Sequence, residues 1–292
     1  MIGTGEPMER LASENEGGLV AHACGAWHGL TYCNSLEAFG EAIRRFRIIE
    51  MDVCVSLDGQ FVVAHAGKAE RVTEQVFLRG RHAKGTAFNL DRLLEMMKEN
   101  RGVRIMLDYQ HDYQEEQADE RFESLLNRLR QSGVADQIIL EVYSRRQVEL
   151  MKSLFPELDC IYGFQDVKKL GPGLFDFPEG FDGFMEYAKE MHIDKVSIAN
   201  AEVQAHPEWG RKLHEANILL FSCAWNTCAE YRAARRLGVD WVTTDWLVPN
   251  ARHDGVSWWG TLLKRSSKYG WKAMRLMERL FRKFFRQKRE AT

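Results

Sequence analysis

Two acidic residues, Glu50 and Asp52, interrupt the apolar run IIEMDV at 48–53. Side chains two positions apart on a strand project from the same face, so the two carboxylates would lie side by side. Buried like charges repel each other unless a cation neutralises them, and a hard, oxygen-binding ion such as Mg²⁺ or Ca²⁺ is the natural partner. Asp108, which follows the run VRIML at 103–107, is a candidate for a third ligand. Each acid taken singly could instead cap a loop or pair with an arginine.

Two histidines also close apolar runs. His22 ends the run LVAH at 19–22, and His65 ends the run FVVAH at 61–65. A lone histidine at a strand end is more often structural than catalytic, but two histidines together with three acids at strand ends indicate a site. Because histidine titrates near neutrality, the pair could act as general acid and general base.

Strand-like and helical segments alternate along the chain and determine where these side chains would lie. The nine strand-like runs fall at 19–22, 48–53, 61–65, 103–107, 138–143, 159–164, 194–200, 218–223 and 240–244. Segments of helical period separate most of them, at 35–46, 90–100, 115–131, 145–154 and 229–237. This alternation predicts parallel βα units. We expect a single α/β domain, a TIM (β/α)8 barrel over 19–250, with its active face at the carboxyl ends of the strands.

Nine runs are one too many for an eight-stranded barrel. A short segment containing SLDG separates the second run from the third, and its Asp-Gly pair is a strong hairpin signal. We therefore expect the third run to fold back beside the second, which would bring His65 close to Glu50 and Asp52. The Gly-, Pro- and Phe-rich stretch at 171–184 is expected to be a long loop over the active face, either packed or acting as a lid.

Composition bounds the class of protein. Of the 292 residues, 45% are hydrophobic and 28% are charged, which suits a packed core and excludes intrinsic disorder. No run approaches the roughly 18 consecutive apolar residues of a membrane-spanning helix, and the first residues lack the layout of a secretory signal. The six cysteines form no CxxC pair and no zinc-type spacing. We expect reduced cysteines in a cytoplasmic chain.

In combination, these motifs resemble those of the glycerophosphodiester phosphodiesterase family, relatives of the phosphatidylinositol-specific phospholipases C with a (β/α)8 barrel. The segments LVAHACG and CNSLEAF are similar to the family's opening strand-His-Arg-Gly and Glu-Asn-Thr patterns. The family's Glu-x-Asp, its turn with glycine and its strand-ending His, followed by Arg and Thr, are similar to Glu50, Asp52, Asp58, Gly59, His65, Arg71 and Thr73.

The resemblance continues through most of 19–250. The segment FNLDRLLEMMKEN followed by RIMLD resembles the family's helix and strand before its third metal carboxylate, which falls on Asp108. Near the end of this span, the family's last strand and final turn are similar to Asn226, Gly238-Val239-Asp240 and Thr244-Asp245.

The resemblance implies a divalent metal, Mg²⁺ or Ca²⁺ with Mn²⁺ as a further candidate, held by Glu50, Asp52 and Asp108. It implies that His22 and His65 divide general acid and general base catalysis on a phosphodiester, and which histidine has which role is left open. A metal would neutralise the nonbridging oxygens of such a diester. The implied substrate is a glycerophosphodiester, a lysophospholipid-like compound or a phosphodiester-linked glycan.

Four positions depart from the family pattern. Ala23 and Ala66 stand where the family has Arg and Asp after its two histidines, Gln110 stands in place of a Lys, and Cys33 replaces the Glu before Asn34. Two cations that would contact a phosphate are therefore absent, and one lost donor of this kind can cost on the order of 100- to 1,000-fold in rate.

Other residues would have to contact the phosphate in place of the two absent cations. The candidates are Asn34, Lys68, Arg71 and Trp225. For Trp225, contact at the barrel mouth and packing in the core are alternatives.

The C-terminal segment at 251–292, like the polar leader at 1–18, lies outside the expected barrel. Its last 36 positions, 257–292, carry eleven Lys or Arg against two Glu, and Leu, Met and Phe recur there at helical spacing opposite the basic residues. Such a basic amphipathic helix suits an anionic membrane surface, which predicts peripheral membrane attachment. A helix docked on the barrel or on a partner is the alternative, and nucleic acid is not an expected partner because the rest of the chain is acidic.

Two other function classes remain open at this stage. A noncatalytic binding protein on the same barrel is consistent with Ala23, Ala66 and Gln110, although it gives no reason to keep two histidines and three acids together. A metal-free glycosidase-type barrel uses paired carboxylates, but it leaves both histidines unexplained.

Overall fold

The computed structural model describes residues 18–67, 69–80, 82, 84–109, 118–164, 177, 179–249 and 255–256. Apart from Gly18, the expected leader falls outside the described residues. Apart from residues 255–256, so does the expected C-terminal tail.

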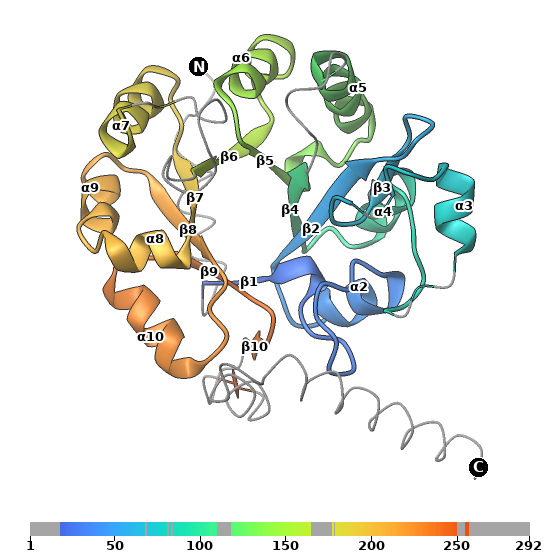
Figure 1. Ribbon diagram of the computed structural model, residues 1–292, viewed down its shortest axis with the longest axis horizontal. Coiled ribbons are helices and arrows are strands. Elements are labelled where there is room, and N and C mark those ends of the chain that lie inside the picture. Colours follow the sequence, from blue (N-terminus) through green and yellow to red (C-terminus); the bar gives the residue numbers. More distant parts are fainter. Residues whose placement is uncertain are drawn as a thin grey trace.

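Eight parallel strands form a closed barrel, and helices surround it (Figure 1). In barrel order the strands are β1 (Leu19–Ala21), β2 (Ile48–Val55), β4 (Arg104–Tyr109), β5 (Ile138–Val142), β6 (Asp159–Phe164), β7 (Lys195–Ala199), β8 (Leu219–Cys223) and β9 (Trp241–Thr244). The barrel closes because β1 pairs in parallel with both β2 and β9. The predicted TIM barrel is confirmed, and each predicted strand-like run contains a strand.

The surplus strand is β3 (Phe61–Val63), which pairs antiparallel with β2 so that Val53 lies opposite Val63. In the intervening turn, Ser56 Oγ donates a hydrogen bond of 2.6 Å to Asp58 Oδ1. Gly59 has φ +76°, a conformation that glycine adopts without a steric penalty. The hairpin predicted from the Asp-Gly pair is therefore confirmed.

Five helices coincide with the predicted helical segments. They are α2 (Leu36–Ala42), α4 (Leu90–Glu99), α5 (Ala118–Gln131), α6 (Arg145–Leu154) and α10 (Cys228–Arg236). Ser35, Asn89, Ser144 and Thr227 cap four of them, because each side chain accepts a hydrogen bond from a backbone N–H of the first turn.

The sequence analysis missed four helices, α3 (Glu74–Arg79), α7 (Phe181–Glu190), α8 (Asn200–Ala205) and α9 (Trp209–Glu215). Three of these have at most seven residues, too few for a helical period to stand out. The fourth corrects an expectation, since α7 begins inside the stretch at 171–184 that was interpreted as a loop. Phe181 and Phe184 are buried there in the hydrophobic core. Residues 171–176 and 178 fall outside the described residues.

Alternation along the strands separates two apolar clusters. Ile49, Met51 and Val53 of β2 belong to the large cluster that includes the buried faces of the helices. Ile48 points the other way and packs with residues of six other strands: Val20, Met106, Ile139, Ile161, Phe221 and Trp241. Glu50 and Asp52 share the face of Ile48 because the side-chain period of a strand is two. The fold therefore places both acids inside the barrel, toward its carboxyl end.

Minor elements complete the described chain. The 3-10 helices are η1 (His22–Cys24) and η2 (Ala135–Gln137), and β10 (Leu247–Val248) pairs antiparallel with β11 (Gly255–Val256). Among the described residues, no helix combines the length and the apolar character needed to cross a membrane.

Candidate active site

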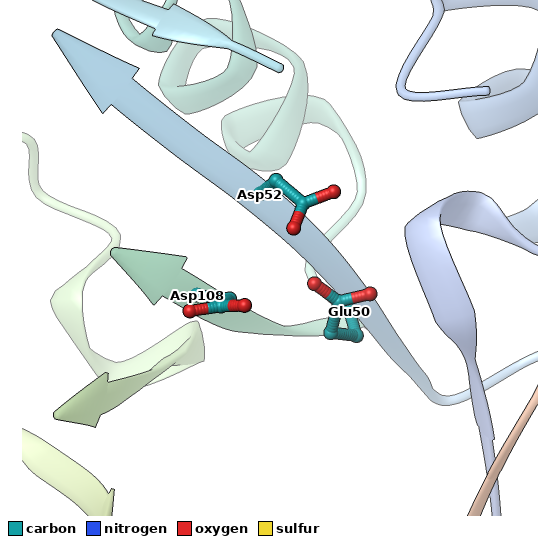
Figure 2. A group of neighbouring side chains, drawn as sticks. All are labelled: Glu50, Asp52 and Asp108. Carbon is teal, nitrogen blue, oxygen red and sulfur yellow. The ribbon is translucent and has the colours of Figure 1, made fainter. Parts of the chain in front are cut away.

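Three carboxylates meet at the carboxyl end of the barrel, two from β2 and one from the adjacent β4 (Figure 2). Glu50, Asp52 and Asp108 each offer an oxygen, and these oxygens lie within 4.8 Å of one another. The side chains are almost completely buried, and the strand register sets Asp52 directly opposite Asp108. The predicted acidic cluster is thus present.

Neighbouring groups orient each carboxylate. The backbone N–H of Ala23 donates a 2.6 Å hydrogen bond to Glu50 Oε2, and Asn34 Nδ2 donates a 2.5 Å bond to Asp52 Oδ2. The hydroxyl of Tyr143 donates a 2.9 Å bond to Asp108 Oδ1. Asn34, which is predicted to bind substrate, holds a carboxylate of the cluster in the described structure.

The cluster has the chemistry of a site for a hard divalent cation. Glu50 Oε1 is buried and has no hydrogen-bond partner. Burial, together with the negative charges of Asp52 and Asp108, raises the pKa of Glu50 well above its ordinary value. An orphaned buried oxygen is costly unless something pairs with it, and a cation between three oxygen ligands would both pair with it and offset the mutual repulsion of the carboxylates.

His22 stands beside this cluster and is held by an aspartate that the sequence analysis had not assigned. His22 Nδ1 lies 2.9 Å from Asp245 Oδ1, while its Nε2 faces Glu50 Oε2 at 4.0 Å. Burial lowers the pKa of His22, but the hydrogen bond and charge of Asp245, with the charges of Asp52 and Asp108, outweigh it and raise the pKa above its ordinary value of 6.5. Asp245 therefore favours the protonated form of the imidazole.

Asp245 is itself fixed by Asn226. Asn226 Nδ2 donates a 2.7 Å hydrogen bond to Asp245 Oδ2, and its Oδ1 accepts bonds from the backbone N–H of Asp245 at 2.7 Å and from the hydroxyl of Thr244 at 3.0 Å. These residues come from the end of β9 and the loop after β8. Asp245 therefore acts on His22 from a rigid position.

His65 approaches the site from the hairpin without a hydrogen bond or ion pair to the three carboxylates. Its Nδ1 lies 3.1 Å from the carbonyl oxygen of Ala66, and its ring centre lies 6.1 Å from that of Tyr32. Tyr32 also contacts His22 edge-on at 4.5 Å between ring centres. Tyr32 therefore neighbours both histidines, and the proximity of His65 to Glu50 and Asp52 stays a prediction.

The other residues predicted to bind substrate lie in three different settings: at the surface, in the core and outside the described residues. Arg71 is exposed, and Lys68 falls outside the described residues, as does Gln110. Trp225 is 1% exposed, packs in the core and donates a 3.0 Å hydrogen bond from Nε1 to Ser222 Oγ. Its position supports the core-packing alternative, so we correct the expectation that its side chain binds substrate.

Sequence reasoning also missed a fourth buried acid, Glu141. It lies on β5 in register with Asp108, and burial and the charge of Asp108 raise its pKa well above the ordinary value, although side-chain hydrogen bonds with Ser197 and Tyr143 oppose the rise. The signal was present, because Glu141 interrupts the apolar run IILEVY as Glu50 interrupts its own. The sequence signal for Asp245 was weaker, since this residue lies just after a strand. The sequence carried no signal for Tyr32, because it lies in a loop.

No protein-family model matches this chain, and no curated protein matches it. Several solved structures, however, do match the chain. A glycerophosphodiester phosphodiesterase from Parabacteroides distasonis matches with a TM-score of 0.63 and 15% identity, covering 79% of this chain and 93% of that one. An Oleispira antarctica phosphodiesterase in complex with the product sn-glycerol-3-phosphate matches with a TM-score of 0.63 and 19% identity, covering 80% and 95%.

A third match is the glycerophosphodiester phosphodiesterase of Thermotoga maritima, with a TM-score of 0.54 and 20% identity over 79% of this chain and 95% of that one. The chain is therefore a TIM-barrel protein with the fold of the glycerophosphodiester phosphodiesterases. The resemblance inferred from its motifs is confirmed at the level of the fold.

Proposed function

We propose that this chain is a metal-dependent phosphoric diester hydrolase that acts on a glycerophosphodiester or a related compound. The observation that carries the proposal is the set of three buried carboxylates, one with an orphaned oxygen, beside a histidine that an aspartate holds. The set lies at the carboxyl end of the barrel, where enzymes of this fold have their active sites. The similar fold of solved phosphodiesterases supports the same reaction class.

In this proposal, Glu50, Asp52 and Asp108 hold a divalent ion, with Mg²⁺, Ca²⁺ and Mn²⁺ as the candidates. When bound, the ion would neutralise phosphoryl oxygens and stabilise the charge that develops in the transition state. Asn34, Tyr143 and the backbone of Ala23 hold the ligand oxygens in place before the metal arrives. Such preorganisation avoids rearrangement during the reaction.

The two histidines would share the proton transfers. Because Nδ1 of His22 is bound to Asp245, its Nε2 is the nitrogen that faces the reacting groups. A pKa above the ordinary value suits Nε2 to donate a proton to the departing alkoxide. His65 would then take the proton from the attacking water or from a neighbouring substrate hydroxyl. Each transfer typically contributes about 100- to 10,000-fold.

The three proposed substrate classes share the phosphodiester and differ in the alcohols. The solved phosphodiesterase from Oleispira antarctica holds the product sn-glycerol-3-phosphate, which supports a small glycerol-containing diester first. A lysophospholipid-like compound or a phosphodiester-linked glycan remains a proposed alternative. The noncatalytic and glycosidase alternatives give no reason for Asp245 to hold His22 beside a cation-binding cluster.

We further propose that the basic segment at 257–292 attaches the enzyme to an anionic membrane surface from the cytoplasmic side. The support comes from the sequence pattern alone, because these residues fall outside the described ones. Attraction to anionic lipid is worth about 1 kcal/mol for each basic residue near the surface.

The proposed activity is tested with the purified full-length protein and a panel of phosphodiesters. The panel contains glycerophosphocholine, glycerophosphoethanolamine, a lysophosphatidylcholine and a glycan phosphodiester, each with Mg²⁺, Ca²⁺ or Mn²⁺ and with a chelator as control. We expect at least one diester to be split into an alcohol and a phosphomonoester only when metal is present. Absence of turnover across the whole panel and all three metals would remove the proposal.

A further inference from the structure

Tyr32 occupies the space between the two histidines at the mouth of the barrel. Its ring meets His22 edge-on at 4.5 Å between ring centres and lies 6.1 Å from the ring of His65. The side chain is 38% exposed. The Tyr32 ring therefore neighbours both histidines.

The loop that carries Tyr32 is fixed from both sides. Tyr32 has φ +54°, which is uncommon for a residue with a side chain and persists only where the surroundings impose it. Lys84 Nζ donates hydrogen bonds to the carbonyl oxygens of Thr31 and Tyr32. Two positions further on, Asn34 is bound to Asp52 of the carboxylate cluster. The contacts on either side set the position of the Tyr32 ring relative to the cluster.

The hydroxyl of Tyr32 is available as a donor. Within the described part of the chain it makes no hydrogen bond, although it lies in the electrostatic field of Asp245, Cys223 and Glu50. Burial and the nearby carboxylates, Asp245 foremost, raise the pKa of Tyr32 above its ordinary value, so the group keeps its proton. A protonated phenol can donate to an anionic oxygen but cannot itself repel one through charge.

The site needs such a donor. His22 is a basic side chain that lies against the cluster, with its Nε2 4.0 Å from Glu50 Oε2. Position 23, next to it, carries an alanine, whose side chain offers no donor. A phosphodiester has two nonbridging oxygens, so if a metal held by the cluster neutralised one of them, the other would need a separate donor.

We propose that Tyr32 is a substrate-binding residue whose hydroxyl donates a hydrogen bond to the outer nonbridging oxygen of the phosphodiester, while its ring keeps the two histidines apart. This inference rests on the proposed function, since it concerns the same site and the same reaction. It assigns to a loop tyrosine the contact that a basic residue would otherwise make.

The test compares Tyr32→Phe with the wild type, because phenylalanine keeps the ring and removes only the hydroxyl. Tyr231→Phe is the matched control, since Tyr231 lies on α10 and has no assigned role in the site. Three quantities are measured for each protein: steady-state kinetics on the best diester, the affinity of the metal-loaded protein for sn-glycerol 3-phosphate, and the rise in melting temperature caused by the metal alone.

We expect Tyr32→Phe to raise KM about tenfold or more and to weaken sn-glycerol 3-phosphate binding by a similar factor, as the loss of a hydrogen bond to a charged group does. The value of kcat should change by less than about threefold, because the bond exists in both ground and transition states. The metal-induced rise in melting temperature should equal that of the wild type, and Tyr231→Phe should match the wild type throughout.

Wild-type values of KM and product affinity in Tyr32→Phe would overturn the inference while leaving the proposed function intact. Loss of the metal-induced rise in melting temperature in Tyr32→Phe would also overturn it, because the residue would then support the metal site rather than the substrate. A wild-type protein that neither turns over any diester nor binds sn-glycerol 3-phosphate would overturn the proposed function together with this inference.

Discussion

Nδ1 of His22 lies 2.9 Å from Oδ1 of Asp245, although the two residues are 223 positions apart in the chain. The two residues directly follow the first and last strands of the barrel, which lie side by side because β1 pairs with β9. Barrel closure thus creates the aspartate-histidine pair at the site. Its consequence is an imidazole whose pKa lies above the ordinary value.

Replacing Asp245 with asparagine should lower the pKa of His22. The carboxylate favours the protonated ring, so its removal leaves burial as the larger influence, and burial disfavours the charged form. The measurement is the titration of the His22 ring protons by NMR in both proteins. The matched control is Asp240→Asn, because Asp240 Oδ2 lies 2.9 Å from Nε2 of His214, outside the proposed site. An unchanged pKa of His22 in Asp245→Asn, or an equal change in the control, would contradict the account.

The same pair predicts how stability depends on pH. A histidine whose pKa is higher in the folded state contributes stability that is complete below its unfolded pKa of about 6.5 and is lost as pH rises through the folded pKa. The extra free energy of unfolding of the wild type over Asp245→Asn should therefore be largest below about pH 6.5 and decrease above it. Urea denaturation across this range measures it, and a difference that grows with pH has the wrong sign.

Divalent metal should stabilise the folded protein, because it binds the three-carboxylate cluster in the folded state. A ligand at 100 times its Kd adds about 2.7 kcal/mol, which should raise the melting temperature by several degrees. Glu50→Gln combined with Asp52→Asn should abolish the rise. Glu41→Gln combined with Asp91→Asn is the control, since neither residue belongs to the cluster. An equal rise in all three proteins would argue against a metal at Glu50 and Asp52.

The strands of the barrel could be predicted because their signal is local. Each run is short, apolar and followed by a helix or a turn, and the Asp58-Gly59 pair indicated that β3 folds back antiparallel beside β2. The short helices α3, α8 and α9 were not predicted, because one or two turns carry no detectable helical period. Helix α7 was not predicted, because its first turn is rich in glycine and phenylalanine and was interpreted as part of a loop.

The residues of the candidate site also differ in whether the local sequence could predict them. Glu50, Asp52 and Asp108 were predictable, since a charged side chain inside an apolar strand is costly unless a partner neutralises it. Glu141 carried the same signal and was overlooked. Asp245 and Tyr32 depend on contacts between distant segments, across barrel closure in one case and through a loop at positive φ in the other. No spacing in the sequence encodes such contacts.

Alanine substitution of His22 or His65 should lower kcat by about 100-fold or more while leaving the fold intact, because in the proposed mechanism each histidine carries one proton transfer. His206→Ala is the control, since His206 stacks on Trp209 away from the cluster. Circular dichroism and melting temperature verify the fold of each variant. Unchanged turnover in either active-site variant would remove the two-histidine mechanism.

Removal of residues 257–292 should release the protein from vesicles that contain anionic lipid, while activity on a small water-soluble diester persists, because the proposed metal ligands and histidines lie at or before Asp108. Binding of the full-length protein should weaken as salt rises, since salt screens charge attraction. Vesicle sedimentation at two salt concentrations measures both effects. If the shortened protein unfolds, or if the full-length protein ignores anionic vesicles at low salt, the membrane proposal should be abandoned.

The central claim is that the carboxylate cluster holds the metal on which phosphodiester hydrolysis depends. Its most direct test is turnover of the best diester by chelator-treated protein as Mg²⁺, Ca²⁺ or Mn²⁺ is titrated back, in the wild type and in the variant carrying both Glu50→Gln and Asp52→Asn. The account predicts that metal restores turnover to the wild type in a saturable manner and restores less than about one hundredth of it to the folded double variant. Turnover that survives chelation, or that metal restores equally in both proteins, would contradict it.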